Sequence, residues 1–600
     1  MNQACSLRPM NPMWFTSFLL ALASMLICSA LTAEAPGQEQ QEQIPPPSST
    51  APAGPVTTVH GIVRNGASGE PLPRALVRIN GDASTGALTD GEGRFEISGV
   101  PTGPQEFQIM KPGFLDSAEA AADSSGENSH GYARNVIVVA NMPDVVFTLS
   151  PVNSIRGQIQ ISSGDPGQGI QVTLLKRIVQ DGRAVWQAGS NAKTNSDGVY
   201  RFGGLSDGSY ALYTEPAMDS DTATNLVDTG SGNNVARNGY ASLFYPESQD
   251  LAGAAKIRLK GGDEAQANFS LTLEPFHPVT ATVVLPGRRQ DAALSADQSG
   301  MNYSVLVMDG QARTLPYTAQ YDAATHSIQA FLPDGTYSFF ITAMASPSRI
   351  SITGSRSMLQ TPATMTGQIG FSVSGRAVSN LRIPVSPTRS SPVHVAVTRT
   401  GTESQGASGV FVTLSQSGGW SSGGMVSSYA QGTSEGPLET TYTPPGSYWV
   451  HTSIAQKWLC EASFTAGGSN LALEPLVLGI GGATAPLSLA LRDDCASLTV
   501  SLPASVAGNV AGVERFYTIF IVPDFDSTED VVPQTLRPST GGTITVSGLT
   551  PGSYHVYAFD RPVALEYRNP AALAALRNPG KAVTLSPGAK ADVVVEVAQP

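Results

Sequence analysis

The sequence repeats one short pattern four times: a turn, a glycine, any residue and a tyrosine. The copies read "LSDGSYAL", "LPDGTYSF", "TPPGSYWV" and "LTPGSYHV". Glycine adopts turn conformations that are costly for other residues, so we expect a positive φ at the turn glycines, Gly208, Gly335, Gly446 and Gly552. A tyrosine after such a turn is typical of Greek-key sandwiches, where its ring fills one end of the core and its hydroxyl donates to upstream backbone. The pattern therefore predicts tyrosine corners at Tyr210, Tyr337, Tyr448 and Tyr554.

The segments between these turns alternate apolar and polar residues, as in "VHGIVRN", "RALVRIN" and "RFEISGV". This two-residue period indicates strands with one buried face. The 61 glycines and 43 prolines among 600 residues also favour short strands joined by turns over long helices. The exception is "NPAALAALRN", where Pro570 suits the first position of a helix.

The recurring pattern divides the chain into serial units, each the size of one small sandwich. We predict an all-β protein with about five Ig-like or transthyretin-like β-sandwiches. The predicted units are residues 56–150, 151–273, 274–391, 392–492 and 493–600, the last with one short helix. Residues 34–55, before the first unit, are rich in Pro and Gln and lack an apolar period, which indicates a disordered linker.

The first residues are typical of an export signal. Arg8 precedes the apolar run "WFTSFLLALASMLIC", and small residues follow it. We expect a signal peptide over residues 1–33 and a mature protein in the periplasm, on the outer cell surface or outside the cell. The alternative is an uncleaved membrane anchor, for which the apolar run is short.

The cysteines fit this expectation. Cys5 and Cys28 belong to the signal, so Cys460 and Cys495 remain as an even pair in an exported protein, which predicts a disulfide. A metal pair is the alternative, but it needs further thiolate or imidazole ligands at suitable spacing, and none is near either cysteine in the sequence. We therefore expect no metal site and no cofactor.

Residues 59–114 contain "GIVRNGASGEPLPRALVRI", "TDGEGRFEISGVPTG" and "KPGF". This part resembles the carboxypeptidase regulatory-like domain, a transthyretin-like sandwich often found in exported bacterial proteins. Residues 154–215 resemble it less closely, and the last three units share only the turn and the tyrosine. The resemblance implies a seven-stranded fold grouped with carbohydrate-binding-like domains. It implies no catalysis, because in zinc carboxypeptidases this module accompanies a separate catalytic domain.

Aromatic residues supply the candidate ligand contacts. Three of them lie on strands that follow a tyrosine corner, and the fourth lies on a glycine-rich loop: Tyr213, Trp449, Tyr557 and Trp420. Such rings can stack on sugars or peptides. The alternative for the strand residues is that they pack against a neighbouring unit or a covering loop.

We therefore expect a non-catalytic protein of the cell envelope that acts as a binding or spacer module, with a glycan or an envelope protein as its partner. Nucleic acid is not expected, because the net charge is −13 and no basic cluster is present. Membrane contact is expected only through an uncleaved signal. Two alternatives are a hydrolase with an unrecognised active site and an accessory module of an outer-membrane transport system. The hydrolase-like string "GTSEG" at residues 432–436 is followed directly by proline, which disfavours a nucleophile elbow.

Overall fold

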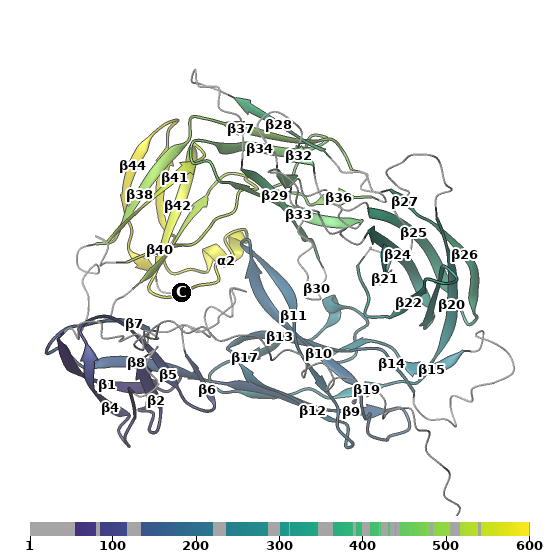
Figure 1. Ribbon diagram of the computed structural model, residues 1–600, viewed down its shortest axis with the longest axis horizontal. Helices are drawn as coiled ribbons and strands as arrows, with labels where there is room; N and C mark the ends of the chain where they lie inside the picture. Colours follow the sequence, from purple (N-terminus) through teal and green to yellow (C-terminus); the bar gives the residue numbers. More distant parts are fainter. Residues whose placement is uncertain are drawn as a thin grey trace, which may run out of the picture. The chain divides into compact units, whose positions relative to one another are not determined.

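The computed structural model describes residues 55–79, 85–116, 134–219, 236–285, 301–310, 313–345, 364–387, 392–398, 409–418, 420–421, 430–431, 438–439, 445–479, 484–503, 516–537 and 542–598. The predicted signal peptide, nearly all of the predicted linker and the "GTSEG" string lie outside the described residues. The described part consists mainly of β-strands and turns, with the short helix α2 (Pro570–Ala574) and the 3-10 turn η1 (Leu251–Gly253) (Figure 1). Pro570 is the first residue of α2, as predicted, and Asn569 caps the helix.

The strands of the described ranges form ten sheets. Five clusters of buried hydrophobic side chains contain residues 59–149, 155–271, 279–385, 410–491 and 496–595. Each draws its members from two facing sheets, and the second also includes Tyr240 from a strand of a third sheet. The all-β fold with several β-sandwiches is therefore confirmed. Each cluster falls inside one of the five predicted units.

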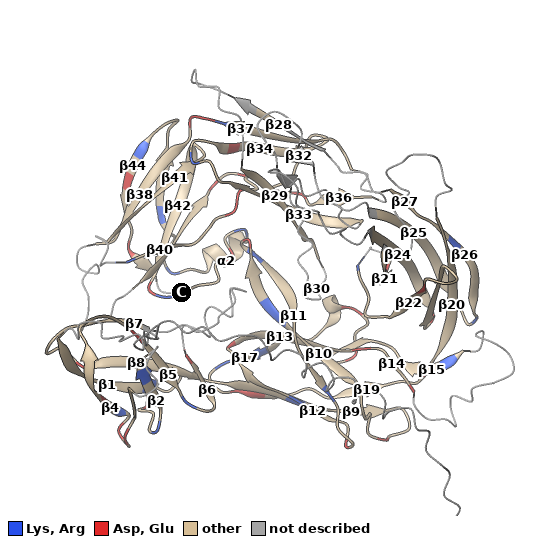
Figure 2. Cartoon of the chain, in the orientation of Figure 1, with Lys and Arg blue, Asp and Glu red and all other residues tan. Residues whose placement is uncertain are grey.

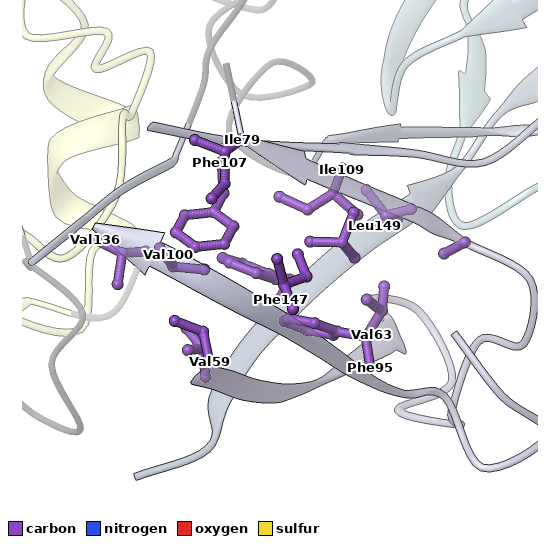
Figure 3. Packing of buried hydrophobic residues seen from close by; sticks show 14 of the residues in the cluster. Val59, Val63, Ile79, Phe95, Val100, Phe107, Ile109, Val136, Phe147 and Leu149 are labelled. Carbon is purple, nitrogen blue, oxygen red and sulfur yellow. The ribbon is translucent and has the colours of Figure 1, made fainter. Parts of the chain in front are cut away.

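The strands of the first sandwich are β1 (Val56–Asn65), β2 (Leu76–Ile79), β3 (Gly86–Leu88), β4 (Arg94–Pro101), β5 (Gly103–Met110), β6 (Phe114–Asp116), β7 (Arg134–Val138) and β8 (Val145–Pro151). They form the sheets β4-β1-β8-β6 and β3-β2-β5-β7. Phe107 is fully buried between these sheets, where it packs near Phe147 (Figure 3). This phenylalanine takes the place in the core that a corner tyrosine takes elsewhere.

The strands of the second sandwich are β9 (Asn153–Ile161), β10 (Gln171–Gln180), β11 (Arg183–Lys193), β12 (Val199–Leu205), β13 (Gly208–Thr214), β16 (Leu243–Phe244), β17 (Ile257–Leu259), β18 (Glu264–Gln266) and β19 (Phe269–Leu271). One sheet has the order β16-β13-β10-β11, with β17 paired to β13, and the other has β12-β9-β18, with β19 paired to β9.

The strands of the third sandwich are β20 (Glu274–Val284), β21 (Met301–Met308), β22 (Ala319–Asp322), β23 (Ser327–Leu332), β24 (Gly335–Ala345), β25 (Thr364–Val373), β26 (Val378–Pro384) and β27 (Ser386–Pro387). Two strands from the second predicted unit, β14 (Ala217–Met218) and β15 (Arg237–Tyr240), extend its first sheet, because β15 pairs with β20. The sheet orders are β14-β15-β20-β23-β22, with β26 paired to β20, and β21-β24-β25-β27.

The strands of the fourth sandwich are β28 (Pro392–Thr398), β29 (Val410–Gln416), β31 (Ala430–Gln431), β32 (Leu438–Glu439), β33 (Gly446–Ile454), β34 (Cys460–Ala466), β35 (Ser469–Asn470), β36 (Leu476–Leu478) and β37 (Leu487–Arg492). They form the sheets β32-β28-β37-β34-β35 and β31-β29-β33-β36. The strand β30 (Trp420–Ser421) comes from the same predicted unit but pairs with β11 of the second sandwich.

The strands of the fifth sandwich are β38 (Ala496–Ser501), β39 (Tyr517–Pro523), β40 (Gln534–Leu536), β41 (Thr543–Leu549), β42 (Gly552–Phe559), β43 (Lys581–Leu585), β44 (Lys590–Val594) and β45 (Val597–Ala598). They form the sheets β41-β38-β44 and β40-β39-β42-β43, with β45 paired to β42. The segment that contains α2 covers the outer face of the second sheet, where Tyr567 and Leu565 pack with Tyr557 and Phe559.

The repeated tyrosines are buried at the starts of β13, β24, β33 and β42. Three hydroxyls donate to the carbonyl oxygen four residues earlier: Tyr210 to Ser206 at 2.8 Å, Tyr337 to Pro333 at 3.1 Å and Tyr554 to Thr550 at 2.5 Å. This is the contact expected of a tyrosine corner. Tyr448 is buried in the same way, with 2% of its surface exposed.

The predicted positive φ of the turn glycines is wrong for Gly335 and Gly552, which lie outside the left-handed region, whereas Gly208 and Gly446 have a φ of 159°, close to extended backbone. At Gly335 the need for glycine has a different physical reason. A Cβ atom on Gly335 would lie 2.7 Å from the hydroxyl oxygen of Tyr337. The glycine therefore leaves room for the tyrosine ring that folds back over the turn.

Removal of one corner hydroxyl tests this account. We expect Tyr554→Phe to lower the free energy of unfolding by about 1–3 kcal/mol, because it leaves the buried Thr550 carbonyl without its donor. Tyr554→Ala should lower it by about 3–5 kcal/mol, because it also removes a buried ring. Thermal unfolding of the full chain measures both changes, and an unchanged melting temperature for Tyr554→Ala would contradict the corner assignment.

Candidate functional site at the β10–β11 hairpin

The hairpin β10–β11 ends in a two-residue turn made by Asp181 and Gly182. The strands pair antiparallel up to Gln180 and Arg183, which directly flank the turn. Asp181 has a φ of 49° and Gly182 a φ of 72°. Positive φ at both central residues defines a type I′ turn, for which Asp-Gly is a preferred sequence. The turn thus places the Asp181 side chain at the tip of a long hairpin.

Arg568 binds the backbone of this tip. Its amide N–H donates to the Gly182 carbonyl at 3.1 Å, and its Nε donates to the Asp181 carbonyl at 3.1 Å. The two Nη atoms donate to the carbonyls of Ser527 at 2.7 Å and Glu529 at 3.3 Å. One guanidinium from the segment before α2 therefore joins the hairpin to the loop after β39.

A second contact lies farther down the hairpin. Nη1 of Arg177, on β10, lies 2.7 Å from Oε1 of Glu566. This carboxylate is 14% exposed and also accepts a hydrogen bond from Asn569, the cap of α2. Despite its partial burial, the pKa of Glu566 is lowered by its hydrogen bonds with Arg177 and Asn569.

His451, on β33, lies between two carboxylates. Its Nε2 atom is 3.2 Å from Oδ2 of Asp181, and its Nδ1 atom is 3.1 Å from Oδ1 of Asp530. Ser415 Oγ, on the neighbouring strand β29, also lies 2.7 Å from Nε2. The imidazole is 3% exposed and the two carboxylates are about a quarter exposed, at 27% and 28%. Side chains from the second, fourth and fifth sandwiches thus meet at one ring.

Arg183 anchors the other side of the turn. Its guanidinium lies 3.8 Å from the centroid of the Trp449 ring, and its Nη2 donates to the Ala472 carbonyl at 3.2 Å. Such stacking is a cation–π interaction, which is stronger when it is shielded from water. Burial and the nearby charge of Arg568 lower the pKa of Arg183 to about 10.

Glu461 is buried and Glu529 is half-buried, and both lie on the segments that carry the site. Glu461, on β34, accepts hydrogen bonds from the Thr528 amide at 2.8 Å and the Thr528 hydroxyl at 2.6 Å. Burial raises the pKa of Glu461, and burial together with the charge of Glu461 raises the pKa of Glu529 to about 8. Burial also raises the pKa of Asp181, an effect that His451 partly offsets. The site therefore concentrates acidic groups in a poorly hydrated place.

Backbone hydrogen bonds hold the loop after β39 against β33. The Thr452 amide donates to the Thr528 carbonyl at 2.9 Å, and the Asp530 amide donates to the Thr452 carbonyl at 3.2 Å. The two threonine hydroxyls lie 2.7 Å apart. This short parallel pairing fixes Asp530 next to His451.

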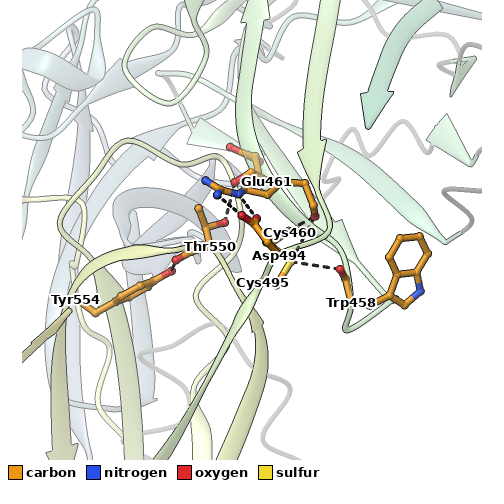
Figure 4. Close-up of a disulfide and its surroundings, with 8 residues drawn as sticks. Trp458, Cys460, Glu461, Asp494, Cys495, Thr550 and Tyr554 are labelled. Carbon is orange, nitrogen blue, oxygen red and sulfur yellow. Dashed lines mark hydrogen bonds and ion pairs between the residues drawn. A yellow bond between two sulfur atoms is a disulfide. The ribbon is translucent and has the colours of Figure 1, made fainter. Parts of the chain in front are cut away.

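The disulfide between Cys460 and Cys495 is present, with an S–S distance of 2.11 Å and a Cα–Cα distance of 5.9 Å (Figure 4). Cys460 begins β34, and Cys495 directly precedes β38, so the bond joins the fourth sandwich to the entry of the fifth. Next to it, the Thr550 hydroxyl donates to the Glu461 carbonyl at 2.7 Å, and the Thr550 carbonyl accepts from Tyr554. The corner of the fifth sandwich is thus tied to the same region.

The side chains around His451 can be compared with a catalytic triad and with a cation site. Ser415, His451 and Asp530 have the connectivity of a serine hydrolase triad. However, the Asp181 carboxylate shares Nε2 with the serine, and a negative charge there would repel a developing oxyanion. Ser415 also lies inside β29, where it is paired with Trp449 in the sheet. Asp181, His451 and Asp530 are also residue types that can hold a metal ion.

The structure does not place the predicted aromatic side chains together on an exposed surface. Tyr213 is 2% exposed and packs with Phe244, and Tyr557 is 4% exposed and packs under the segment that contains α2. This burial fits the alternative drawn from the sequence, that the two rings pack against other parts of the chain, and their assignment as ligand contacts stays a prediction. Trp449 is partly buried beneath Arg183. The backbone of Trp420 pairs with Trp186 of β11, and its side chain lies outside the described part.

The sequence analysis missed the hairpin and its partners. The signal that predicts the turn is the Asp-Gly pair at residues 181–182, between apolar alternating runs. No local pattern links this pair to His451 or Asp530, which come from other units.

Comparisons with known proteins support the assignment of the first sandwich. Residues 58–130 match the family model described as carboxypeptidase regulatory-like domain, so the first sandwich carries this domain. No curated protein matches the chain.

Several solved structures match parts of the chain. The TIE protein of Bacillus anthracis is 10% identical, with 91% of this chain and 75% of that chain covered and a TM-score of 0.15. The minor pilin GBS52 of Streptococcus agalactiae is 15% identical, with 39% and 100% covered and a TM-score of 0.18. A streptococcal ancillary pilin is 10% identical, with 55% and 99% covered and a TM-score of 0.18. At these identities and TM-scores the likenesses show neither a ligand nor a partner.

Two further observations on the described residues concern membrane-spanning helices and the distribution of charge. None of their helices has the length and apolar character needed to cross a bilayer. Figure 2 shows Lys and Arg interspersed with Asp and Glu over strands and loops of the described part.

A methyl group at the hairpin turn tests whether the docking is tight. A Cβ atom on Gly182 would lie 2.6 Å from ring atoms of Tyr567. We expect Gly182→Ala to lower the melting temperature and to speed proteolysis at the turn, because it adds this clash to the strain of an alanine at positive φ. The matched control is Gly204→Ala, because Gly204 has a φ of 74° and open space around its Cβ position. Equal effects of the two variants would contradict tight docking.

The buried carboxyl groups predict how stability depends on pH. Glu529 has a pKa of about 8 in the folded chain against 4.5 for an ordinary glutamate, so the folded state holds a proton that the unfolded state releases. Its contribution therefore makes the free energy of unfolding fall as pH rises from about 5 to 8. We expect Glu529→Gln to flatten this slope in thermal melts over the same range. The exposed control Glu92→Gln should retain the wild-type slope, and an unchanged slope for Glu529→Gln would refute this assignment.

Proposed function

We propose that this chain is a non-catalytic protein of the cell envelope, in which serial β-sandwiches act as a structural spacer. The hairpin β10–β11 serves as the joint that holds sandwiches distant in sequence in one folded unit. The carboxypeptidase regulatory-like domain is the first module of this array.

The observation that carries the proposal is the set of contacts at the hairpin tip. Asp181 and Gly182 belong to the second sandwich, whereas their partners His451 and Arg568 belong to the fourth and fifth. In a simple chain of repeats each unit contacts only its neighbours. Polar contacts between non-neighbouring units support a scaffold whose units are held together.

Two observations support a place outside the cytoplasm and a structural role. Cys460 and Cys495 form a disulfide, a bond that persists in oxidising compartments. The rings of Tyr213 and Tyr557 fill space between chain segments, so they support packing and not glycan recognition. An envelope protein is the partner class that fits a spacer.

The function of the hairpin as a joint is tested by calorimetry of the full chain. We expect the second, fourth and fifth sandwiches of the wild type to unfold in a shared transition. Arg568→Gln removes the donors to the hairpin and to the loop after β39, so it should split this transition. The matched control is Arg561→Gln, because Arg561 is 58% exposed and pairs only with its neighbour Asp560 among the contacts of the described part. Identical unfolding transitions in the wild type and Arg568→Gln would contradict the proposal that the hairpin joins the sandwiches.

The non-catalytic character is tested separately with a fluorophosphonate probe, which labels activated serines. We expect the wild type to show no more labelling than Ser415→Ala. Stoichiometric labelling of Ser415 would overturn the proposal in favour of a hydrolase that uses the Ser415, His451 and Asp530 connectivity.

A further inference from the structure

We propose that Asp181, His451 and Ser415 form a binding site for a divalent transition-metal ion such as Zn²⁺. This inference goes beyond the spacer function, because it assigns a ligand to the joint. It also differs from the expectation drawn from the sequence, where no metal site is visible because the ligands are far apart along the chain.

The distances match the spacing of ligands around one ion. Oδ2 of Asp181 lies 3.2 Å from Nε2 of His451, and Oγ of Ser415 lies 2.7 Å from the same nitrogen. With metal–ligand bonds of about 2.1 Å, the 3.2 Å separation corresponds to an angle of about 100° at the ion, between octahedral and tetrahedral values. The 2.7 Å separation corresponds to about 80°, so the serine hydroxyl has to move away from Nε2 to take a regular position around the ion. One candidate ligand atom each from Asp181, His451 and Asp530 lies within 4.8 Å of the others, so the supporting carboxylate belongs to the same cluster.

Asp530 takes the role of a supporting group. Its carboxylate lies 3.1 Å from Nδ1 of His451, on the opposite side of the ring from Asp181. Histidines that bind metals usually donate their second N–H to a carboxylate or carbonyl, which fixes the tautomer and leaves the other nitrogen free to bind. The pair formed by Asp530 and His451 has this arrangement.

The charges of Arg568 and Arg183 act on the Asp181 carboxylate, but both arginines direct their hydrogen bonds to other groups. Arg568 uses its guanidinium to donate to the carbonyls of Asp181, Ser527 and Glu529. Arg183 donates to the Ala472 carbonyl and stacks on Trp449. The hydrogen bonds of both arginines thus go to backbone oxygens, and the carboxylates of Asp181 and Asp530 share one imidazole. A divalent ion would neutralise the two carboxylates around a neutral imidazole.

Metal and proton compete for the same nitrogen. With a proton on Nε2, the imidazole bridges Asp181 and Asp530 as a cation. Metal binding breaks the Nε2–H bond, releases that proton to solvent and forms bonds from Nε2 and Oδ2 to the ion, with no change in oxidation state. The nitrogen ligand favours Zn²⁺ or Co²⁺ over Ca²⁺, which prefers an all-oxygen site.

Titration calorimetry of the untagged full chain with ZnCl₂ tests the site. We expect one ion per chain and at least a tenfold loss of affinity in His451→Gln and Asp181→Asn. Asp530→Asn should lose about 10–100-fold, as is usual for supporting groups. The matched control is His555→Gln, because His555 pairs with Asp524 at 2.7 Å in a more exposed place and should leave zinc binding unchanged.

Two further readouts keep the outcome clear if a variant is unstable. Co²⁺ should give visible absorption bands in the wild type that Zn²⁺ displaces, and CaCl₂ should give no binding heat. Absence of Zn²⁺ binding at 100-fold excess over the protein, or equal binding by wild type and a folded Asp181→Asn, would overturn the site. Neither result affects the calorimetric test of the hairpin as a joint. The metal-site proposal and the spacer proposal can therefore be contradicted independently of each other.

Discussion

The structure depends on one buried contact between units distant in the chain: the imidazole of His451 between the carboxylates of Asp181 and Asp530. A buried charge without a partner is strongly destabilising, whereas a paired and hydrogen-bonded one is tolerated. The three side chains therefore depend on one another, and each comes from a different sandwich. Removal of one of these three side chains leaves a remaining polar side chain without its partner in a poorly hydrated place.

Local rules explain why these residues can meet. The type I′ turn carries Asp181 to the hairpin tip, and the glycine beside it allows the Tyr567 ring to approach. The pairing of Thr452 with the loop after β39 places Asp530 next to β33. The disulfide beside Glu461 joins the two sandwiches that hold the histidine and its second carboxylate. Elements that serve packing in each sandwich thus also build the site.

The sequence predicts the parts of this structure that depend on short-range patterns. The alternation of apolar residues predicts the strands of the sandwiches. The Gly-x-Tyr pattern predicts that Tyr210 and Tyr554 are buried, and the even number of cysteines after the signal predicts the disulfide. The φ of Gly335 was mispredicted because the space needed by the Tyr337 ring, not the turn conformation, selects glycine there. The site itself was not predictable, because Asp181 and His451 are brought together only by contacts between sandwiches, which leave no periodic signal.

The most direct measurement of the central claim is a double-mutant cycle between Asp181 and His451. The free energies of unfolding of wild type, Asp181→Asn, His451→Gln and the double variant give the coupling between the two side chains. The account predicts a coupling of about 0.5–3 kcal/mol, the range for residues in one buried polar network. Additive effects within about 0.3–0.5 kcal/mol, the behaviour of distant and independent sites, would contradict it.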